Sequence, residues 1–425
     1  MNPRVTFVLV TYGGGPMAAR CLEVLAEHTD EPYEVVVVDS ASPDGTGQWL
    51  QDNLESATVI RLSQNLGFGA GCNVGVEHAG TEFVCFLNAD VEVTEGWLPP
   101  LLELLDGKPE AAAVAPLMVF PDGRVQEAGS LLGGDAYSRG WGDGQYDVDS
   151  FYPRVVDYAS AACLVMRRKA FYEVGGFSPE YHIAYYEDTD LQFMLRRHGW
   201  QVWVQPASRV LHVRHGTSST ATAERLSDIN REVFRRRHAD DLATRPPSLG
   251  IHEHPHRLWW LRDRPTTARI LVVGGEEELD AALLTELRDR DHEAAVTLFV
   301  PEEPEHDWRP AGIEVVSGAE PEPWSRERVG LYDVVIALGP GTAAAEITEW
   351  QPQAVRVLRL DVLPHVAWEK KYARDRKRED AIRAGVERAR LASAEEWAQT
   401  VIRADDVLDD VLVDCGLAPA KSDTA

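Results

Sequence analysis

The fold of this chain is decided by Phe83-Val84-Cys85-Phe86-Leu87-Asn88-Ala89-Asp90-Val91-Glu92-Val93. The apolar part predicts a buried strand, because it is short, rich in aromatic and β-branched residues, and has no helical period. Asn88 and Asp90 follow where the strand ends, and their spacing of two directs both side chains to the same side. Ligands of parallel sheets lie at such strand ends, and carboxylates there suit a hard divalent cation. The alternative is an ordinary polar turn that closes the strand.

Length and composition describe a globular chain of two or three domains. Its 425 residues are 44% hydrophobic and 26% charged, which is sufficient for sizeable cores. The net charge of −27 excludes a broad nucleic-acid surface and a polybasic membrane anchor. Five cysteines without CxxC spacing indicate reduced core residues rather than a zinc or disulfide framework.

Two absences in the sequence bear on where the protein works. No run approaches the length of a membrane span, and the chain begins on a strand rather than on a signal peptide. We therefore expect a cytoplasmic protein without a transmembrane segment. Peripheral contact with the inner face of the membrane is left open.

The first part of the chain alternates buried strands with helices. Apolar runs at 5–10, 35–38, 59–62 and 83–87 are separated by amphipathic segments, which predicts an α/β fold with a mostly parallel sheet. Asp39 follows the second run directly. An acid at this position commonly binds a ribose or base, and the alternative is a helix or loop cap.

A glycine-rich segment precedes the stretch quoted above. Glycines at 67, 69 and 71 allow the backbone to approach a ligand closely. A helix then starts, and its free N–H groups can receive an anion. The earlier Gly13-Gly14-Gly15 has neither G-x-G-x-x-G spacing nor a following P-loop lysine, so it gives only a weak phosphate signal.

Four ordered blocks of this sequence resemble the family 2 inverting glycosyltransferases of GT-A fold, in their rhamnosyltransferase-like branch. The likeness covers residues 4–220. The blocks are Thr11-Tyr12, Val37-Val38-Asp39-Ser40-Ala41-Ser42-Pro43-Asp44-Gly45-Thr46, Asn65-Leu66-Gly67-Phe68-Gly69-Ala70-Gly71-Cys72-Asn73-Val74-Gly75 and Leu87-Asn88-Ala89-Asp90.

The resemblance implies a nucleotide-sugar site with a divalent cation, Mg²⁺ or Mn²⁺. Asp90 would be the carboxylate on the metal. The family usually has Asp-x-Asp there, and this chain departs from it with Asn88 at the first position. The residues that would bind the nucleotide sugar are Thr11, Tyr12, Asp39, Ser40, Asn65, Gly67, Asn73 and Asn88, with Arg214 neutralising the diphosphate.

A second acidic cluster, Glu187-Asp188-Thr189-Asp190, begins an amphipathic helix. The simple interpretation is capping and support of the helix dipole. The functional one is a general base, because neighbouring acids raise one another's pKa and such a base can take a proton from an acceptor hydroxyl. The resemblance assigns that role to Asp188, with Glu187 as an acceptor or indirect contact.

Further along, His212 and His215 lie near Gly216 and Ser218, as in the family's last core motif. The resemblance implies that one of them completes metal binding, and we favour His212. The alternative is a solvated histidine pair. Residues 121–153 show no period and predict a long loop region near the site. The charged helix 224–238 predicts a solvated face, with contact to an anionic acceptor such as a lipid diphosphate as the alternative.

The sequence predicts four segments. Residues 1–240 form the GT-A domain, 241–267 a proline-interrupted linker, 268–415 a smaller Rossmann-like α/β domain of unknown role, and 416–425 a tail. The second domain lacks G-x-G-x-x-G after its first strand, so a dinucleotide site is not expected there.

The prediction for function is a metal-dependent inverting hexosyltransferase of polysaccharide, glycolipid or metabolite biosynthesis. A dTDP- or UDP-sugar is the expected donor, with rhamnose favoured, and the acceptor is a saccharide, a lipid-linked sugar or a small molecule. The alternatives are a sugar nucleotidyltransferase, which is expected to carry a basic residue in its first glycine-rich loop, and a non-catalytic nucleotide-sugar-binding protein.

Overall fold

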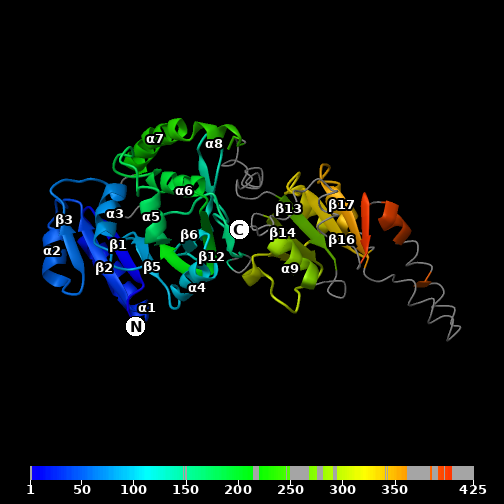
Figure 1. The fold of residues 1–425 in the computed structure, drawn as a ribbon, viewed down its shortest axis with the longest axis horizontal. Helices are drawn as coiled ribbons and strands as arrows, with labels where there is room; N and C mark the ends of the chain where they lie inside the picture. The colour runs from blue at the N-terminus through cyan, green and yellow to red at the C-terminus, as the bar shows by residue number, and fades with distance from the viewer. Residues whose placement is uncertain are drawn as a thin grey trace. The chain divides into compact units, whose positions relative to one another are not determined.

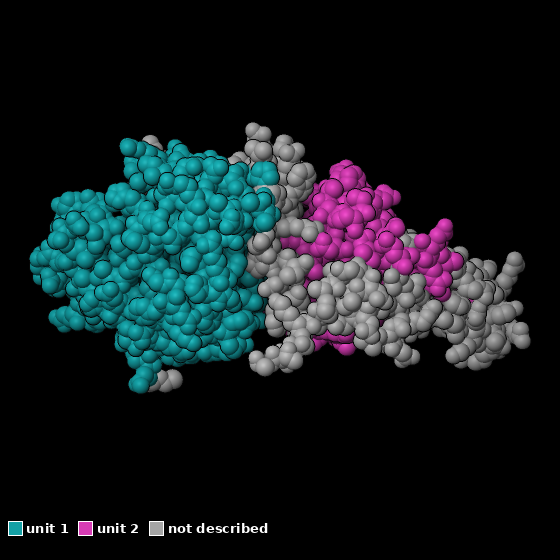
Figure 2. Space-filling view, turned by 45° about the horizontal axis from the view of Figure 1, so that its top comes forward, with its two compact units in different colours: residues 1–252, 263–265 teal, residues 253–262, 266–425 magenta. Residues whose placement is uncertain are grey.

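The computed structural model describes residues 2–146, 148, 151–213, 220–245, 247–248, 268–274, 281–290, 294–339, 341, 343–360, 383–384, 391–396 and 398–403. The chain divides into two compact units, residues 1–252 with 263–265, and residues 253–262 with 266–425 (Figure 2). Part of the predicted linker packs on the first unit, where the Arg245 side chain is buried. The predicted domain limits stay a prediction, and the tail 416–425 lies outside the described residues.

The first unit contains a ten-stranded sheet with the order β10-β12-β6-β11-β4-β1-β2-β3, to which β5 and β7 add by pairing with β12 and β6. The strands of this unit are β1 (Val5–Thr11), β2 (Tyr33–Asp39), β3 (Thr58–Arg61), β4 (Phe83–Leu87), β5 (Val91–Val93), β6 (Ala111–Val119), β7 (Val125–Glu127), β8 (Ser130–Leu132), β9 (Ser138–Gly140), β10 (Arg154–Val155), β11 (Cys163–Arg167) and β12 (Gln201–His212). Strands β1–β4 pair in parallel, as does β6 with β12, whereas β11 runs antiparallel between β4 and β6.

Two apolar cores cover the two faces of this sheet. Successive side chains of β4 point to opposite faces of the sheet, so Phe83 and Cys85 contribute to one core and Phe86 to the other. Helices α1 and α4 complete the first core and α3, α5 and α6 the second (Figure 1). The helices are α1 (Gly15–His28), α2 (Thr46–Asn53), α3 (Phe68–Glu77), α4 (Pro99–Gly107), α5 (Arg168–Glu173), α6 (Glu187–Arg197), α7 (Thr220–Arg237) and α8 (Ala239–Ala243).

The segment predicted as a long loop, 121–153, contains regular structure. Strand β7 pairs with β6, and β8 pairs with β9 in a separate two-stranded sheet. The prediction was wrong because strands of three residues are too short to show a period. This segment brings β7 to the edge of the site.

The second unit contains a six-stranded sheet in which every pairing is parallel, with the order β15-β14-β13-β16-β17-β18. Numbered from its first strand this is 3-2-1-4-5-6, the order of a doubly wound fold, which confirms the predicted Rossmann-like sheet. Its strands are β13 (Ala268–Val273), β14 (Ala294–Val300), β15 (Glu314–Ser317), β16 (Val334–Leu338), β17 (Val355–Leu360) and β18 (Thr400–Arg403). Its helices are α9 (Ala281–Arg290), the 3-10 helix η3 (Arg309–Ala311), α10 (Pro321–Arg326) and α11 (Ala343–Thr348).

In the part of the chain that the structure describes, no helix combines the length and the apolar character that crossing a bilayer requires.

Candidate active site

A cavity of about 650 Å³ lies at the carboxyl ends of β1, β2 and β4 in the first unit. This is the edge of a parallel sheet at which ligands bind. Ten of the predicted site residues line it, contributed by strand ends, a glycine-rich loop and the start of α6. They are Thr11, Tyr12, Ser40, Asn65, Gly67, Asn88, Asp90, Glu187, Asp188 and His212.

One side of the cavity is a hydrogen-bonded loop of residues 65–67 ahead of α3, called the donor loop because the sequence predicts that it binds the nucleotide sugar. Asn65 Oδ1 accepts bonds from Ser40 Oγ at 3.1 Å and from the Gly67 amide at 2.9 Å. Gly67 has a φ of +82°, and a Cβ there would lie 2.3 Å from the Ile183 carbonyl oxygen, so glycine is required. The Phe68 amide donates to that carbonyl at 2.7 Å, so the first N–H of α3 is already used by protein.

Two predicted nucleotide-binding residues do not line the cavity. Asp39 is buried and accepts a bond from the Ser42 amide at 3.2 Å, which is the capping contact considered as its alternative. Asn73 exchanges two hydrogen bonds of 2.9 Å with the backbone of Phe177 and thereby ties α3 to the segment after α5. Their proposed roles in binding stay predictions, and both side chains have structural contacts.

Strand pairing builds the candidate metal site. Val91 of β5 pairs with His212 of β12, which brings Asp90 beside the histidine. Asp90 Oδ1 lies 3.4 Å from His212 Nε2, and both side chains are about nine-tenths buried. On its other side, His212 Nδ1 lies 3.0 Å from Nε2 of Gln126.

A carboxylate and an imidazole at the cavity wall fit a divalent cation such as Mg²⁺ or Mn²⁺. In the described part of the chain, no three His, Cys, Asp or Glu side chains form a complete metal site. Asp90 and His212 would therefore share the ion with donor phosphates and water, which is the usual mode for Mg²⁺. Arg214 and His215, also predicted for this site, lie outside the described residues.

The candidate base stands at the start of α6, opposite the strand ends. Asp188 Oδ2 accepts a bond from the Ala161 amide at 3.2 Å, and Oδ1 accepts one from Thr189 at 2.7 Å. Three non-glycine residues with positive φ precede the helix: Ile183 at 66°, Tyr185 at 80° and Tyr186 at 68°. Such backbone costs energy and requires surrounding contacts to hold it.

Burial raises the pKa of Glu187 and Asp188 more than repulsion between the two carboxylates does. The loss of water around Asp188 raises the pKa of its carboxyl, against two amides that stabilise the charged form. Burial raises the pKa of Glu187 well above its ordinary range, and the Asp188 charge adds to this. Glu187 lines the cavity, and its buried Oε2 has no hydrogen-bond partner in the part of the chain that the structure describes. Asp188 is thus a stronger base than an exposed aspartate, and Glu187 tends towards its neutral form.

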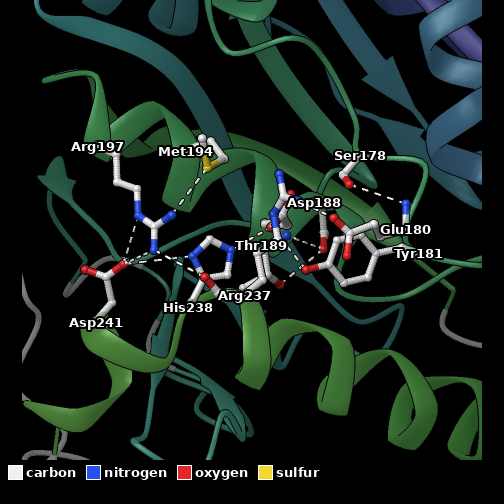
Figure 3. A network of polar contacts seen from close by, with 11 residues as sticks. Ser178, Glu180, Tyr181, Asp188, Thr189, Met194, Arg197, Arg237, His238 and Asp241 are labelled. Atoms are coloured by element: carbon white, nitrogen blue, oxygen red, sulfur yellow. Dashed lines mark hydrogen bonds and ion pairs between the residues drawn. The ribbon is translucent and has the colours of Figure 1, made fainter.

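Contacts from the C-terminal end of α7 and from the residue that follows it hold the start of α6. Asp190 Oδ1 lies 2.6 Å from His238 Nε2, 2.8 Å from Arg237 Nε and 3.1 Å from the Tyr181 hydroxyl. Figure 3 shows this network beside Asp188. Asp190 is fully buried, so its role is to anchor the helix rather than to bind substrate.

Asn230 of α7 holds the loop that leads into α6. Its Nδ2 lies 3.2, 2.8 and 3.1 Å from the carbonyl oxygens of His182, Ala184 and Tyr185. Sequence reasoning missed both Asn230 and Gln126. Neither belongs to a local motif, and their partners lie 46 and 86 residues away, for Ala184 and His212 respectively.

Comparisons with known proteins agree with this geometry. The family model described as Glycosyl transferase family 2 matches residues 6–175. The N-acetylglucosaminyl-diphospho-decaprenol L-rhamnosyltransferase of Mycobacterium tuberculosis is 30% identical over 258 residues, which cover 55% of this chain and 84% of that protein. The pre-mycofactocin glycosyltransferase of the same organism is 31% identical over 181 residues, covering 42% and 37%.

Two solved structures also resemble the chain. One is GalNAc-T7 with UDP, GalNAc and Mn²⁺, at 16% identity and a TM-score of 0.46, covering 60% of this chain and 51% of that one. The other is the mannosyltransferase PcManGT from Pyrobaculum calidifontis in complex with GDP-Man and Mn²⁺, at 21% identity and a TM-score of 0.42, covering 61% and 70%.

The family match and the mostly parallel sheet make the first unit a glycosyltransferase domain of α/β fold, as the sequence predicted. The chain belongs to glycosyl transferase family 2. The predictions of enzyme class and of a rhamnosyltransferase-like relative are confirmed.

Proposed function

We propose that this chain transfers L-rhamnose from dTDP-rhamnose to a hydroxyl of an N-acetylglucosaminyl-diphospho-lipid, with inversion at the anomeric carbon. The observation that carries the proposal is that Asp188 and the Asp90–His212 pair line one cavity together with the donor loop. The printed name of the Mycobacterium tuberculosis relative supports the sugar and the acceptor class. UDP-sugars are the next choice of donor.

In this proposal Asp90 and His212 hold a Mg²⁺ or Mn²⁺ ion with the donor diphosphate. The ion, when bound, supplies positive charge that stabilises the leaving diphosphate. Thr11, Tyr12, Ser40 and Asn65 line the donor end of the cavity, where the nucleotide is proposed to bind.

The transfer itself requires one base. Asp188 takes the proton from the acceptor hydroxyl, and the hydroxyl oxygen forms a bond to the anomeric carbon. The bond from that carbon to the diphosphate oxygen breaks at the same time, and the nucleoside diphosphate leaves with the electron pair. Attack from the face opposite the leaving group inverts the configuration, and no covalent bond to the protein forms.

Calorimetric binding of dTDP and UDP, with and without Mn²⁺, tests the site. We expect metal-dependent binding of dTDP to the wild type and its loss in Asp90→Ala. Asp52→Ala, on the exposed end of α2, is the matched control and should bind like the wild type. Metal-dependent binding of UDP alone would move the proposal to a UDP-sugar, and binding of neither nucleotide would contradict it.

A further inference from the structure

Gln126 lies directly behind His212, on the side away from Asp90. Its side-chain Nε2 is 3.0 Å from His212 Nδ1, and the residue is only 3% exposed. Its Oε1 is buried and has no hydrogen-bond partner among the described residues. A buried amide with one end against an imidazole and the other end unsatisfied has lost hydration without full compensation.

The two orientations of this amide have opposite consequences for the metal site. If Nε2 of Gln126 donates to Nδ1, a neutral His212 carries its proton on Nε2, the atom that faces Asp90. That atom then has no lone pair for a cation. After a half-turn of the amide, Oε1 accepts a bond from Nδ1–H, and the Nε2 lone pair of His212 points towards Asp90. The half-turn also gives the unsatisfied oxygen its partner.

A β-bulge in strand β7 carries the Gln126 side chain. In the pairing of β7 with β6, Glu127 lies opposite Met118 and Val125 opposite Val119, so Gln126 is the extra residue of a bulge. Bulges re-aim a side chain and are frequent beside active sites. The bulge packs against Gly140, where a Cβ would lie 2.7 Å from the Gln126 carbonyl oxygen.

We propose that Gln126 is a positioning residue for the metal ligand His212: its amide oxygen accepts the Nδ1–H and holds the imidazole with the Nε2 lone pair towards the cation. Metal-binding histidines are generally held in this way by an acceptor on the second ring nitrogen. The inference rests on the metal site of the proposed function and adds a residue to it.

Titration of Mn²⁺ into the full chain, alone and with dTDP, tests the inference through affinity rather than turnover. We expect Gln126→Leu to weaken Mn²⁺ binding by roughly 10–100-fold, the usual effect of removing such a partner. Gln126→Glu should bind at least as tightly as the wild type, because a carboxylate can only accept. Gln201→Leu, at the far end of β12, is the matched control and should not change the affinity.

Electron paramagnetic resonance of the bound Mn²⁺ gives a second readout. The wild type and Gln126→Glu should show nitrogen coupling from His212, and Gln126→Leu should lose most of it. If leucine lowers the melting temperature strongly, Gln126→Met replaces it as an apolar side chain of similar length.

The outcomes separate the two proposals. If the wild type binds Mn²⁺ and Asp90→Ala does not, but Gln126→Leu binds like the wild type with its nitrogen coupling intact, the inference about Gln126 is wrong and the metal site stands. Equal weakening by Glu and Leu would also overturn it. If the wild type binds no Mn²⁺, the metal of the proposed function is wrong, and the inference falls with it.

Discussion

Replacing Asp188 by asparagine removes the proposed base with a minimal change of shape. The carboxylate accepts bonds from the Ala161 and Thr189 amides at 3.2 and 2.7 Å. An asparagine oxygen keeps one of these bonds, so the start of α6 should stay in place. A positioned general base contributes about 10²–10⁴ in rate, which corresponds to about 3–5 kcal/mol in the barrier. We therefore expect kcat to fall by that factor.

The assay measures release of dTDP from dTDP-rhamnose in the presence of an N-acetylglucosaminyl-diphospho-lipid. Binding of dTDP with Mn²⁺, measured by calorimetry, should be unchanged, because the Asp188 carboxylate bonds to the Ala161 and Thr189 amides and the Asp90–His212 pair is proposed to hold the ion. Asp188→Glu keeps a carboxylate on a longer side chain and should retain more activity than asparagine. Turnover of Asp188→Asn near that of the wild type would refute the assignment of the base.

The pH profile gives an independent check of the same residue. A base acts when deprotonated, so kcat should rise with pH through the pKa of Asp188. Burial raises that pKa above the ordinary value of 3.8, and the acid limb should lie correspondingly higher than for an exposed aspartate. In Asp188→Asn the residual rate should lack this limb. An unchanged limb in the variant would show that another group titrates there.

Two further predictions concern the loop and the helix that present the base. Asn230→Leu removes three hydrogen bonds, to the carbonyls of His182, Ala184 and Tyr185. It should lower the free energy of unfolding by at least about 1–3 kcal/mol and lower kcat. The control Asn53→Leu, at the exposed end of α2, should change neither. Equal urea midpoints for the wild type and Asn230→Leu would contradict this. Burial raises the pKa of Glu187, so the wild type loses stability as pH rises above the ordinary value of 4.5. Glutamine does not titrate, so the urea midpoint of Glu187→Gln should increase relative to that of the wild type as pH increases. A difference that does not depend on pH would show that this pKa is not raised.

The fold could be predicted because its strands are long enough to carry a pattern. The five residues of β4 are all fully buried, and no helical period competes with this interpretation. A local signal made Asp90 and Asp188 candidates, a strand end in one case and a helix start in the other, and the family resemblance supplied the role predicted for each. Such local signals can be recognised from neighbouring residues alone, without knowledge of distant contacts.

Gln126, Asn230 and the conformation of the loop before α6 could not be predicted, because they depend on distant contacts. Gln126 depends on a bulge in a three-residue strand, and no sequence period marks such a position. Ile183 and Tyr186 adopt positive φ, which the sequence does not suggest for β-branched or aromatic residues. The role of Asn73 in binding the nucleotide sugar stays a prediction, and no local signal announces the two hydrogen bonds that its side chain makes with the backbone of Phe177.

The strained loop 183–186 connects the candidate base Asp188 to two separate parts of the first unit, the donor loop and α7. Its three left-handed residues cost roughly 1–3 kcal/mol each, so they persist only because contacts from outside the loop hold them. On one side, the Phe68 amide at the donor loop binds the Ile183 carbonyl at 2.7 Å. On the other side, Asn230 of α7 binds three carbonyls, and His238 anchors Asp190 at 2.6 Å. The donor loop and α7 therefore both bond to the backbone that places Asp188, and we expect a substitution in either element to shift the base without contacting it.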